Sequence, residues 1–253
     1  MTTKTALVTG AAAGIGKACA LRLAREGIAV GVLDLNLEGC EQVAAEIRSA
    51  GGKAIALQAS IADRDQVTAA VTKLRDAFGP VTVVVNNAGI SNFIAFEELT
   101  DDDWDKMFII NTKGTFIVTQ VVLPDMKAAK WGRIVNISSS SAQTGSVEQV
   151  HYSASKGAVI SMTRSLAQAL GPHGITVNNI PPGAVMGTIM SEANKHRFKM
   201  PIETLQKMIP VGRTGEPEDI ANACAWLRSN PSASRTMAES RLTVLRSAPL
   251  SSP

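Results

Sequence analysis

Tyr152 and Lys156 are the residues whose types and spacing most directly predict chemistry in this chain of 253 residues. Positions four apart lie on one face of a helix, so the phenol and the ammonium would be neighbours. A nearby cation favours the phenolate, which would let the tyrosine exchange a proton near neutral pH. A glycine-rich segment, Thr9–Gly16, directly follows a short apolar run far upstream. The two features in this order are a much more specific signal than either alone.

Gly10, Gly14 and Gly16 stand where a first strand would turn into a first helix. Small residues there let backbone amides approach a pyrophosphate at the helix N-terminus. A glycine-rich turn without a ligand is the alternative. Asn86–Gly89 follows another apolar run, and its amides could tie neighbouring loops together, although a plain Asn/Gly turn is again the simpler interpretation.

Asp34 ends the second expected strand, 18 residues after Gly16. A carboxylate there can accept both ribose hydroxyls of NAD and repels the 2′-phosphate of NADP. Leu35 and Ala13 flank that space, and neither is cationic. We therefore expect NAD(H) as the preferred cofactor and NADP(H) as the less favoured one, unless Asp34 is merely a turn residue.

Two further polar features could belong to a catalytic centre. Ser138–Ser141 closes an expected strand at the edge of the sheet where ligands bind in such folds. Asn111 is an amide within an otherwise apolar helix, and alone it could equally be a satisfied core residue. The three histidines show no charge-relay spacing, which argues against a Ser-His-Asp hydrolase. They are His151, His173 and His196.

Strands and helices alternate along the chain, which predicts an α/β fold with a single doubly wound, Rossmann-type parallel sheet. The expected strands are Ala6–Thr9, Ala29–Asp34, Ala54–Ala59, Val81–Val85, Arg133–Ser138 and Thr176–Ile180. The expected helices are Gly14–Glu26, Leu37–Ala50, Asp63–Phe78, Asp101–Lys130 as one or two helices, Tyr152–Leu170 and Pro217–Leu227. We expect one catalytic domain over residues 1–227, with a lid over about 187–208, followed by an atypical tail over 228–253.

The composition, 45% hydrophobic and 19% charged, is that of an ordinary globular protein. The net charge of +3 arises in the tail from Arg228 onward, so it does not indicate nucleic-acid binding. Three isolated cysteines predict neither a disulfide framework nor a metal site. We expect no membrane span and no signal peptide, and therefore a cytoplasmic protein.

Over Thr5–Leu227 the chain resembles the short-chain dehydrogenase/reductase family. Thr9–Gly16 is similar to its TGxxxGxG motif, Asn86–Gly89 to its NNAG and Tyr152–Lys156 to its YxASK. The family's catalytic serine lies 13 residues before the tyrosine, which selects Ser139, and its catalytic asparagine falls on Asn111.

The resemblance implies hydride transfer between a nicotinamide and a secondary alcohol or ketone, with no metal. Tyr152 would be the acid/base, Lys156 would lower the pKa of the tyrosine and bind the ribose, Ser139 would hydrogen-bond the substrate oxygen, and Asn111 would hold a relay water. The implied cofactor-binding residues are Gly10, Gly14, Ile15, Gly16, Asp34, Leu35, Ile61, Asn87, Ala88, Gly89, Tyr152, Lys156, Pro182, Gly183 and Val185.

Three departures from the family pattern stand out. Ser60 replaces an aspartate near the adenine, and Thr188 arrives one position late after Pro182–Gly183. From Arg228 onward the usual seventh strand and Asp-Gly-Gly are missing. A changed reading frame near Arg228 is one hypothesis, which resequencing of the 3′ end would test, and a divergent tail is the other. Without a seventh strand the sixth would be an exposed edge.

The lid and pocket residues predict a substrate with a largely apolar body, if Met186, Ile189, Met190, Phe198 and Met200 face inward. Packing of the lid onto the domain is the alternative. A basic cluster, Lys195–Arg197 with Lys199, could meet an anionic carrier, as in an NADPH-dependent 3-oxoacyl-carrier-protein reductase, or could be a solvated face. A non-catalytic dinucleotide-binding regulator and an inactive structural subunit are further alternatives. The resemblance also implies a homotetramer or homodimer.

Overall fold

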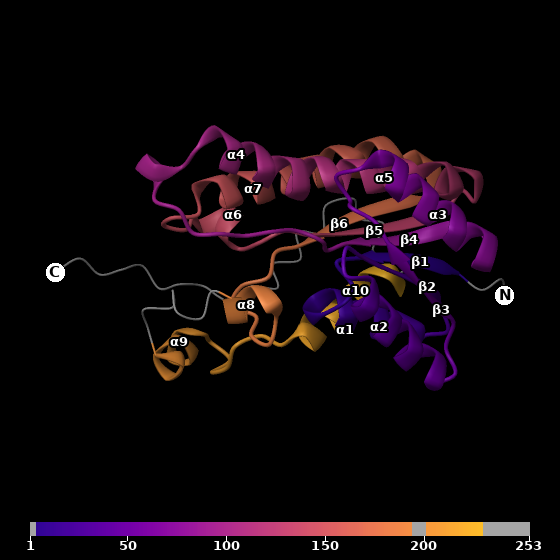
Figure 1. Ribbon diagram of the computed structural model, residues 1–253, viewed down its shortest axis with the longest axis horizontal. Coiled ribbons are helices and arrows are strands. Elements are labelled where there is room, and N and C mark those ends of the chain that lie inside the picture. Colours follow the sequence, from indigo (N-terminus) through magenta and orange to yellow (C-terminus); the bar gives the residue numbers. More distant parts are fainter. Residues whose placement is uncertain (1–3, 194–200, 230–253) are drawn as a thin grey trace.

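The computed structural model describes residues 4–193 and 201–229 of the chain. In this part of the chain six parallel strands form one sheet in the order β3-β2-β1-β4-β5-β6, with helices on both faces (Figure 1). The strands are β1 (Thr5–Thr9), β2 (Ala29–Asp34), β3 (Ala54–Gln58), β4 (Val81–Asn86), β5 (Gly132–Ile137) and β6 (Ile175–Ile180). The predicted doubly wound α/β fold is therefore confirmed, with strand ends that differ by about one residue from those expected.

The strand order reverses between β1 and β4. From β1 the chain runs outward through β2 and β3, then crosses to β4 on the other side of β1. In parallel sheets, ligands bind at the carboxyl ends of the strands where the order reverses. The glycine-rich loop follows β1 and the Asn86–Gly89 segment follows β4, so the topology brings both motifs to that point.

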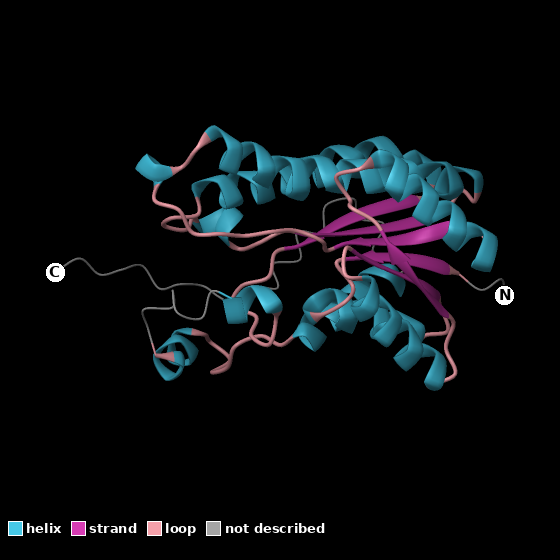
Figure 2. Cartoon of the chain, viewed as in Figure 1, coloured by secondary structure: helices cyan, strands magenta, loops and turns pink. Residues whose placement is uncertain are grey.

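Helices cover the two faces of the sheet as two layers (Figures 1 and 2). On one face, α1 (Gly14–Ala24), α2 (Leu37–Ser49) and α10 (Pro217–Ser229) pack on the sheet in one buried apolar cluster. On the other face, α3 (Arg64–Phe78), α5 (Gly114–Ala128) and α7 (Val150–Leu170) contribute to a second cluster. The strands are buried from both sides, which explains their continuous apolar sequence.

The helix ends follow from local sequence. Asn36 caps α2 by accepting a hydrogen bond from the Gly39 amide. Asp63 likewise accepts from the amides of Asp65 and Gln66, so it is the cap of α3 and the helix begins one residue later than predicted.

The predicted helical region 101–130 is interrupted. It consists of α4 (Asp101–Phe108), a π-helical turn (Ile109–Lys113) and α5. By length and composition alone, Asp101–Ala128 could cross a membrane. Its second half packs in the core of the sheet through Ile117, Val118 and Val122, and buried core helices pass the same test.

The described chain ends with α10, two residues beyond the helix end that the sequence predicted. Arg228 pairs with Glu26 of the segment after α1, so it belongs to the folded body rather than to a tail. Within the described residues β6 is hydrogen-bonded to β5 alone, at the edge of the sheet. The expectations for a seventh strand, for the tail beyond Ser229 and for the Lys195–Arg197 cluster concern residues outside the described ranges.

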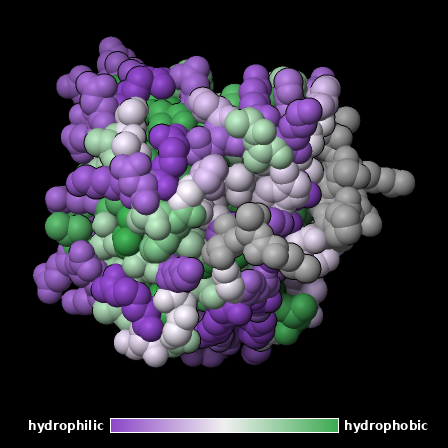
Figure 3. All heavy atoms as spheres, turned by 90° about the vertical axis from the view of Figure 1, so that its right-hand side faces the viewer, coloured by the Kyte–Doolittle hydropathy of each residue, from purple (hydrophilic) through white to green (hydrophobic). Residues whose placement is uncertain are grey.

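Figure 3 views the side of the molecule on which the strands begin. Hydrophilic side chains cover most of this side, with smaller hydrophobic areas between them. The loops that follow the strands, together with α8 and α9, lie at the opposite end, where the strands finish (Figure 1).

Candidate active site

The loop between β1 and α1 requires two of its glycines for close backbone approach. Gly10 has φ +64°, and a Cβ there would lie 2.8 Å from Ala88 Cα. A Cβ on Gly16 would lie 2.1 Å from the carbonyl oxygen of Gly10. Both contacts are with backbone, which has little freedom to yield, so a side chain at either position would displace the loop.

The segment after β4 is hydrogen-bonded to this loop, so it is more than the plain Asn/Gly turn that was the simpler interpretation of its sequence. The Thr9 hydroxyl accepts hydrogen bonds from the amides of Asn87 and Ala88, both at 3.1 Å. The Asn87 side chain donates to the carbonyls of Thr9 and Gly10 at 3.0 and 3.1 Å. The two motifs therefore form one rigid unit at the carboxyl edge of the sheet.

The start of α1 suits a bound pyrophosphate. Its cap residue, Ala13, offers no side-chain acceptor, and the first turn contains no acidic residue. The leading amides of a helix lack intrahelical partners and attract an anion. A dinucleotide therefore fits this end of the sheet, with Ile15 lining the adjacent cavity.

Asp34 occupies the predicted position at the end of β2, but its carboxylate is engaged by backbone. Oδ2 accepts from the Ala12 amide at 3.3 Å, and Oδ1 accepts from the Asn36 amide at 3.1 Å. Leu35 next to it is 67% exposed. Asp34 thus holds the β1–α1 loop against the end of β2 whatever the ribose carries.

The other predicted cofactor residues separate into two groups. Ile61 is buried and packs against Gly114, so its side chain belongs to the core. Ser60, which departs from the family pattern, accepts a hydrogen bond from the Ala62 amide. Lining the cavity are Ile15, Asn87, Gly89, Tyr152, Lys156, Pro182, Gly183 and Val185, while Gly10, Gly14, Gly16, Asp34, Leu35, Ile61 and Ala88 are not among its lining residues.

Tyr152 and Lys156 lie together on α7, both almost fully buried. The Lys156 Nζ donates to the Ile137 carbonyl at 3.0 Å and lies 5.9 Å from the centre of the Tyr152 ring. Burial lowers the pKa of Lys156 from 10.5 to about 8. With one hydrogen bond made, the ammonium keeps two N–H groups that can donate to a ligand.

The pKa of Tyr152 moves in the direction opposite to the one expected. Burial raises the pKa, because it disfavours the phenolate, and a hydrogen bond from Ser139 lowers it by less. The expectation that Lys156 brings this pKa toward neutrality is therefore wrong for the protein alone, since desolvation of the phenolate prevails. A tyrosine in this state keeps its proton at neutral pH and can donate it.

Ser139 is oriented by its neighbour Ser141. The Ser141 amide and hydroxyl both donate to Ser139 Oγ, at 3.2 and 2.9 Å. Because those bonds use the lone pairs of the oxygen, the Ser139 hydrogen is left to point toward Tyr152 or a substrate oxygen. Ser141 thus helps to orient Ser139.

Asn111 lies in the π-helical turn and is fully buried. Its side-chain amide makes two hydrogen bonds with the Ile90 backbone: it accepts from the Ile90 amide at 2.9 Å and donates to the Ile90 carbonyl at 3.0 Å. It also donates to Ser155 Oγ on α7 at 3.1 Å. Within this structure Asn111 therefore joins the segment after β4 to the helix that carries Tyr152.

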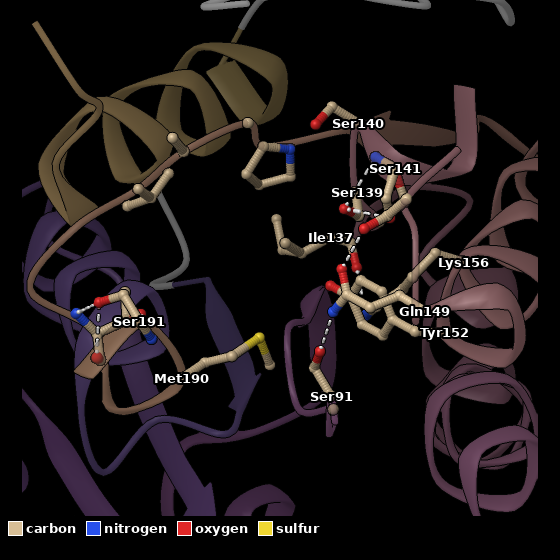
Figure 4. A pocket seen from close by; sticks show the side chains of 18 of the residues that line it. Ser91, Ile137, Ser139, Ser140, Ser141, Gln149, Tyr152, Lys156, Met190 and Ser191 are labelled. Carbon is tan, nitrogen blue, oxygen red and sulfur yellow. Dashed lines mark hydrogen bonds between the residues drawn. The ribbon is translucent and has the colours of Figure 1, made fainter. Parts of the chain in front are cut away.

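Tyr152, Lys156 and Ser139 border a cavity of about 360 Å³ (Figure 4). Tyr152, Ser139 and Ser91 lie on one side of it, and Met190 points into it from the other side. Met186 also lines the cavity, so two of the five apolar residues considered for the pocket border it. The structure does not describe the side chain of Ile189, and Phe198 and Met200 lie outside the described residues.

Within the range predicted as a lid, about 187–208, the structure describes α8 (Ile189–Ala193) and α9 (Ile202–Met208). Thr188 lines the cavity, but its hydroxyl accepts a hydrogen bond from the Ser191 amide at 3.0 Å. Its oxygen thus caps α8.

Gln149 is a cavity residue that sequence reasoning missed. It is buried, donates to Ser91 Oγ at 2.7 Å and accepts from Ser146 Oγ at 2.7 Å. Its position three residues before Tyr152 could have pointed to it in the sequence, but Gln149 precedes the helix as its N-cap, so helical spacing does not apply to it.

Among the described residues, no group of three or more His, Cys, Asp or Glu side chains is placed to hold a metal.

Three comparisons relate this chain to known proteins. The family model described as short chain dehydrogenase matches residues 4–198. The chain is 38% identical over 229 residues to the 3-oxoacyl-[acyl-carrier-protein] reductase FabG of Thermotoga maritima, covering 90% of this chain and 92% of the relative. It is 37% identical over 246 residues to the acetoacetyl-CoA reductase of Cupriavidus necator, covering 94% and 96%.

A solved structure is similar throughout. The actinorhodin polyketide ketoreductase, crystallised as a single-residue variant with NADPH, superposes with a TM-score of 0.86 at 35% identity, covering 92% of this chain and 94% of that chain. The cofactor in that structure contradicts our prediction of an NAD preference, which rested on Asp34. The hydrogen bonds of its carboxylate with two backbone amides give a physical reason, because an aspartate with a structural task does not by itself select the cofactor.

Proposed function

Because this chain belongs to the short-chain dehydrogenase/reductase family and is an oxidoreductase acting on an alcohol/ketone pair, we propose that it reduces the ketone of 3-oxoacyl thioesters with NADPH. The observation that supports this most is the similarity, over nine tenths of the chain, to reductases of 3-oxoacyl-carrier-protein and of acetoacetyl-CoA. The ketoreductase structure with NADPH supports the cofactor. We further propose a cytoplasmic homo-oligomer with its catalytic domain ending at α10.

In the proposed reduction, Tyr152 and Ser139 both act on the ketone oxygen. The bound cofactor would supply hydride to the ketone carbon. Tyr152, which holds its proton at neutral pH, donates that proton to the ketone oxygen. Ser139 donates a hydrogen bond to the same oxygen as negative charge develops there.

Lys156 and Asn111 act around these two groups in the proposal. The ammonium of Lys156 would hold the ribose hydroxyls with the N–H groups that Ile137 leaves available. Asn111 fixes the segment over the substrate through Ile90, and its position beside α7 is compatible with the relay water implied by the resemblance. The glycine loop and the start of α1 would receive the pyrophosphate.

The reaction direction agrees with the state of the tyrosine. A phenol with a raised pKa keeps its proton at neutral pH, so the protonated form that ketone reduction requires is the populated one. Oxidation of the alcohol would need the phenolate and should improve at alkaline pH.

The test is turnover of acetoacetyl-CoA by the purified protein with NADPH and, separately, with NADH, followed by the loss of reduced-nicotinamide absorbance. We expect turnover with NADPH at least tenfold more efficient than with NADH. No reduction of acetoacetyl-CoA or of a longer 3-oxoacyl thioester, from a protein that binds NADPH, would refute the substrate class. Preference for NADH would refute the cofactor.

Two neighbouring serines provide a matched pair of variants. Ser139→Ala removes the donor to the substrate oxygen and should lower kcat by roughly a hundredfold or more. Ser140→Ala changes another serine that lines the cavity, without a proposed role in the reaction, and should leave kcat within about threefold of the wild type. Equal losses in both variants would contradict the role of Ser139.

A further inference from the structure

The segment Ile90–Ile94, here called the 90–94 loop, has no helix or strand of its own but is fastened repeatedly. Asn111 holds its first residue, as described above. Its other ties run to the residues just before Tyr152. The Ile94 amide donates to the Glu148 carbonyl at 2.8 Å, Gln149 donates to Ser91, and His151 contacts Asn92.

The contact between His151 and Asn92 is short, and it is buried on the side of His151. The imidazole Nε2 lies 2.6 Å from Asn92 Oδ1, and His151 has no exposed surface. A carboxamide oxygen can only accept, so Nε2 carries the hydrogen. Nδ1 is buried without a hydrogen-bond partner in the described structure, which leaves it as an unprotonated nitrogen.

The imidazole is therefore neutral. Burial lowers the pKa of His151, and the carboxylate of Asp103 on α4 raises it by less. The 90–94 loop contributes no charged group, because its residues are Ile, Ser, Asn, Phe and Ile. The hydrogen bond between the neutral imidazole and the neutral Asn92 amide therefore needs no charged group nearby to balance it.

The residues on either side of Asn92 border the substrate cavity. Ser91 and Phe93 both line it, and Figure 4 shows Ser91 directed toward Gln149 near Tyr152. The Ser91 oxygen accepts from Gln149, so its hydrogen is left for a ligand. A tie at Asn92 fixes the backbone between these two lining residues.

We propose that His151 is a positioning residue, which sets the substrate affinity by fastening the 90–94 loop to the start of the helix that carries Tyr152. It acts through Asn92 and touches no reacting atom. The choice of substrate rests on the proposed function, whereas the geometry rests on the observed contact between His151 and Asn92. Loss of the tie should weaken substrate binding while leaving the proton donor and the cofactor site in place.

The test compares His151→Leu with His151→Gln. Leucine fills the space without a donor, and the amide nitrogen of glutamine can reach the place of Nε2. We expect His151→Leu to raise KM for acetoacetyl-CoA about tenfold, the equivalent of one buried hydrogen bond, with kcat and the Kd for NADPH within about twofold of the wild type. His151→Gln should restore KM to within about threefold.

Asn92→Ala removes the tie from its other end and should reproduce the KM of His151→Leu. The double variant should be no worse than either single one, since both remove the same contact. Additive effects, equal KM values for the Gln and Leu variants, or parallel losses of kcat and NADPH affinity would each overturn the proposal in favour of a general structural role.

A second measurement does not depend on the substrate. Amide hydrogen exchange of residues 90–94 should accelerate in His151→Leu and stay near the wild type in His151→Gln. Unchanged exchange in both would overturn the inference. A wild type that reduces no 3-oxoacyl thioester but shows the expected exchange pattern would refute the proposed substrate class alone and would support this tie.

Discussion

Replacing Lys156 by methionine should stabilise the protein alone while abolishing turnover. The side chain is buried, and its ammonium makes one hydrogen bond, to the Ile137 carbonyl. A pKa lowered from 10.5 to about 8 means that the buried charge opposes folding by about 3 kcal/mol at neutral pH. Loss of the hydrogen bond costs about 1 kcal/mol. Lys156→Met should thus be more stable by about 2 kcal/mol near pH 7.

The sign of the pH dependence follows from which state holds the proton. Between pH 8 and 10.5 the unfolded chain keeps the lysine proton that the folded protein has released. The stability of the wild type therefore rises with pH relative to the variant. The opposing term falls from about 3 kcal/mol near pH 7 to about 1 kcal/mol near pH 10, so the advantage of the methionine variant should vanish there.

Urea unfolding of both proteins without cofactor, in a series from about pH 7 to pH 10, measures this difference. Other titrating groups are common to both chains and cancel. Lys53→Met, at an exposed position before β3, is the matched control and should show a constant difference. A pH-independent difference for Lys156→Met would refute the argument that burial of the charge opposes folding. Retained turnover in that variant would refute its role in the site.

Asp34→Ala should lower the free energy of unfolding by about 1–3 kcal/mol, because two backbone amides lose their acceptor. Urea unfolding without cofactor measures this change, and an unchanged stability would mean that Asp34 serves the cofactor alone. Gly16→Ala should weaken NADPH binding at least tenfold in a fluorescence titration, since its Cβ would lie against the Gly10 carbonyl, and unchanged binding would contradict the close packing. Burial lowers the pKa of His151 below 6.5, so as the pH falls the unfolded chain binds the histidine proton before the folded protein does. The free energy of unfolding should therefore decrease below about pH 6.5, and it should decrease less in His151→Gln, as measured by unfolding in a series of acid buffers. An identical decrease in both proteins would exclude this histidine as the cause.

The sequence predicted the layers of the fold because its strands are apolar on both faces and alternate with helical segments along the chain. It also predicted where Tyr152 and Lys156 meet, since helical spacing is local. The boundaries moved by one or two residues where a capping side chain decided the end, as Asp63 does for α3.

The remaining parts of the site depend on contacts between distant segments. The bond between His151 and Asn92 joins residues 59 apart, and nothing in either neighbourhood predicts it. Asp34 misled the cofactor prediction because spacing shows that a carboxylate is present but not which amides already use it. The raised pKa of Tyr152 likewise follows from burial, which the sequence does not show at single-residue resolution.

The position of α10 has a consequence for how this protein is made. Cys224 of α10 lies 3.6 Å from Cys19 of α1, and Arg22 bonds Asn222 across the same contact. Helix α1 thus meets α10 only after some 200 residues more have been synthesised. Contacts so distant in sequence are slow to form, so the face of the sheet that α1 and α10 cover together should remain incompletely covered during translation until α10 arrives. Chains truncated before Pro217 would keep this apolar face of α1 open and should depend on chaperones or aggregate.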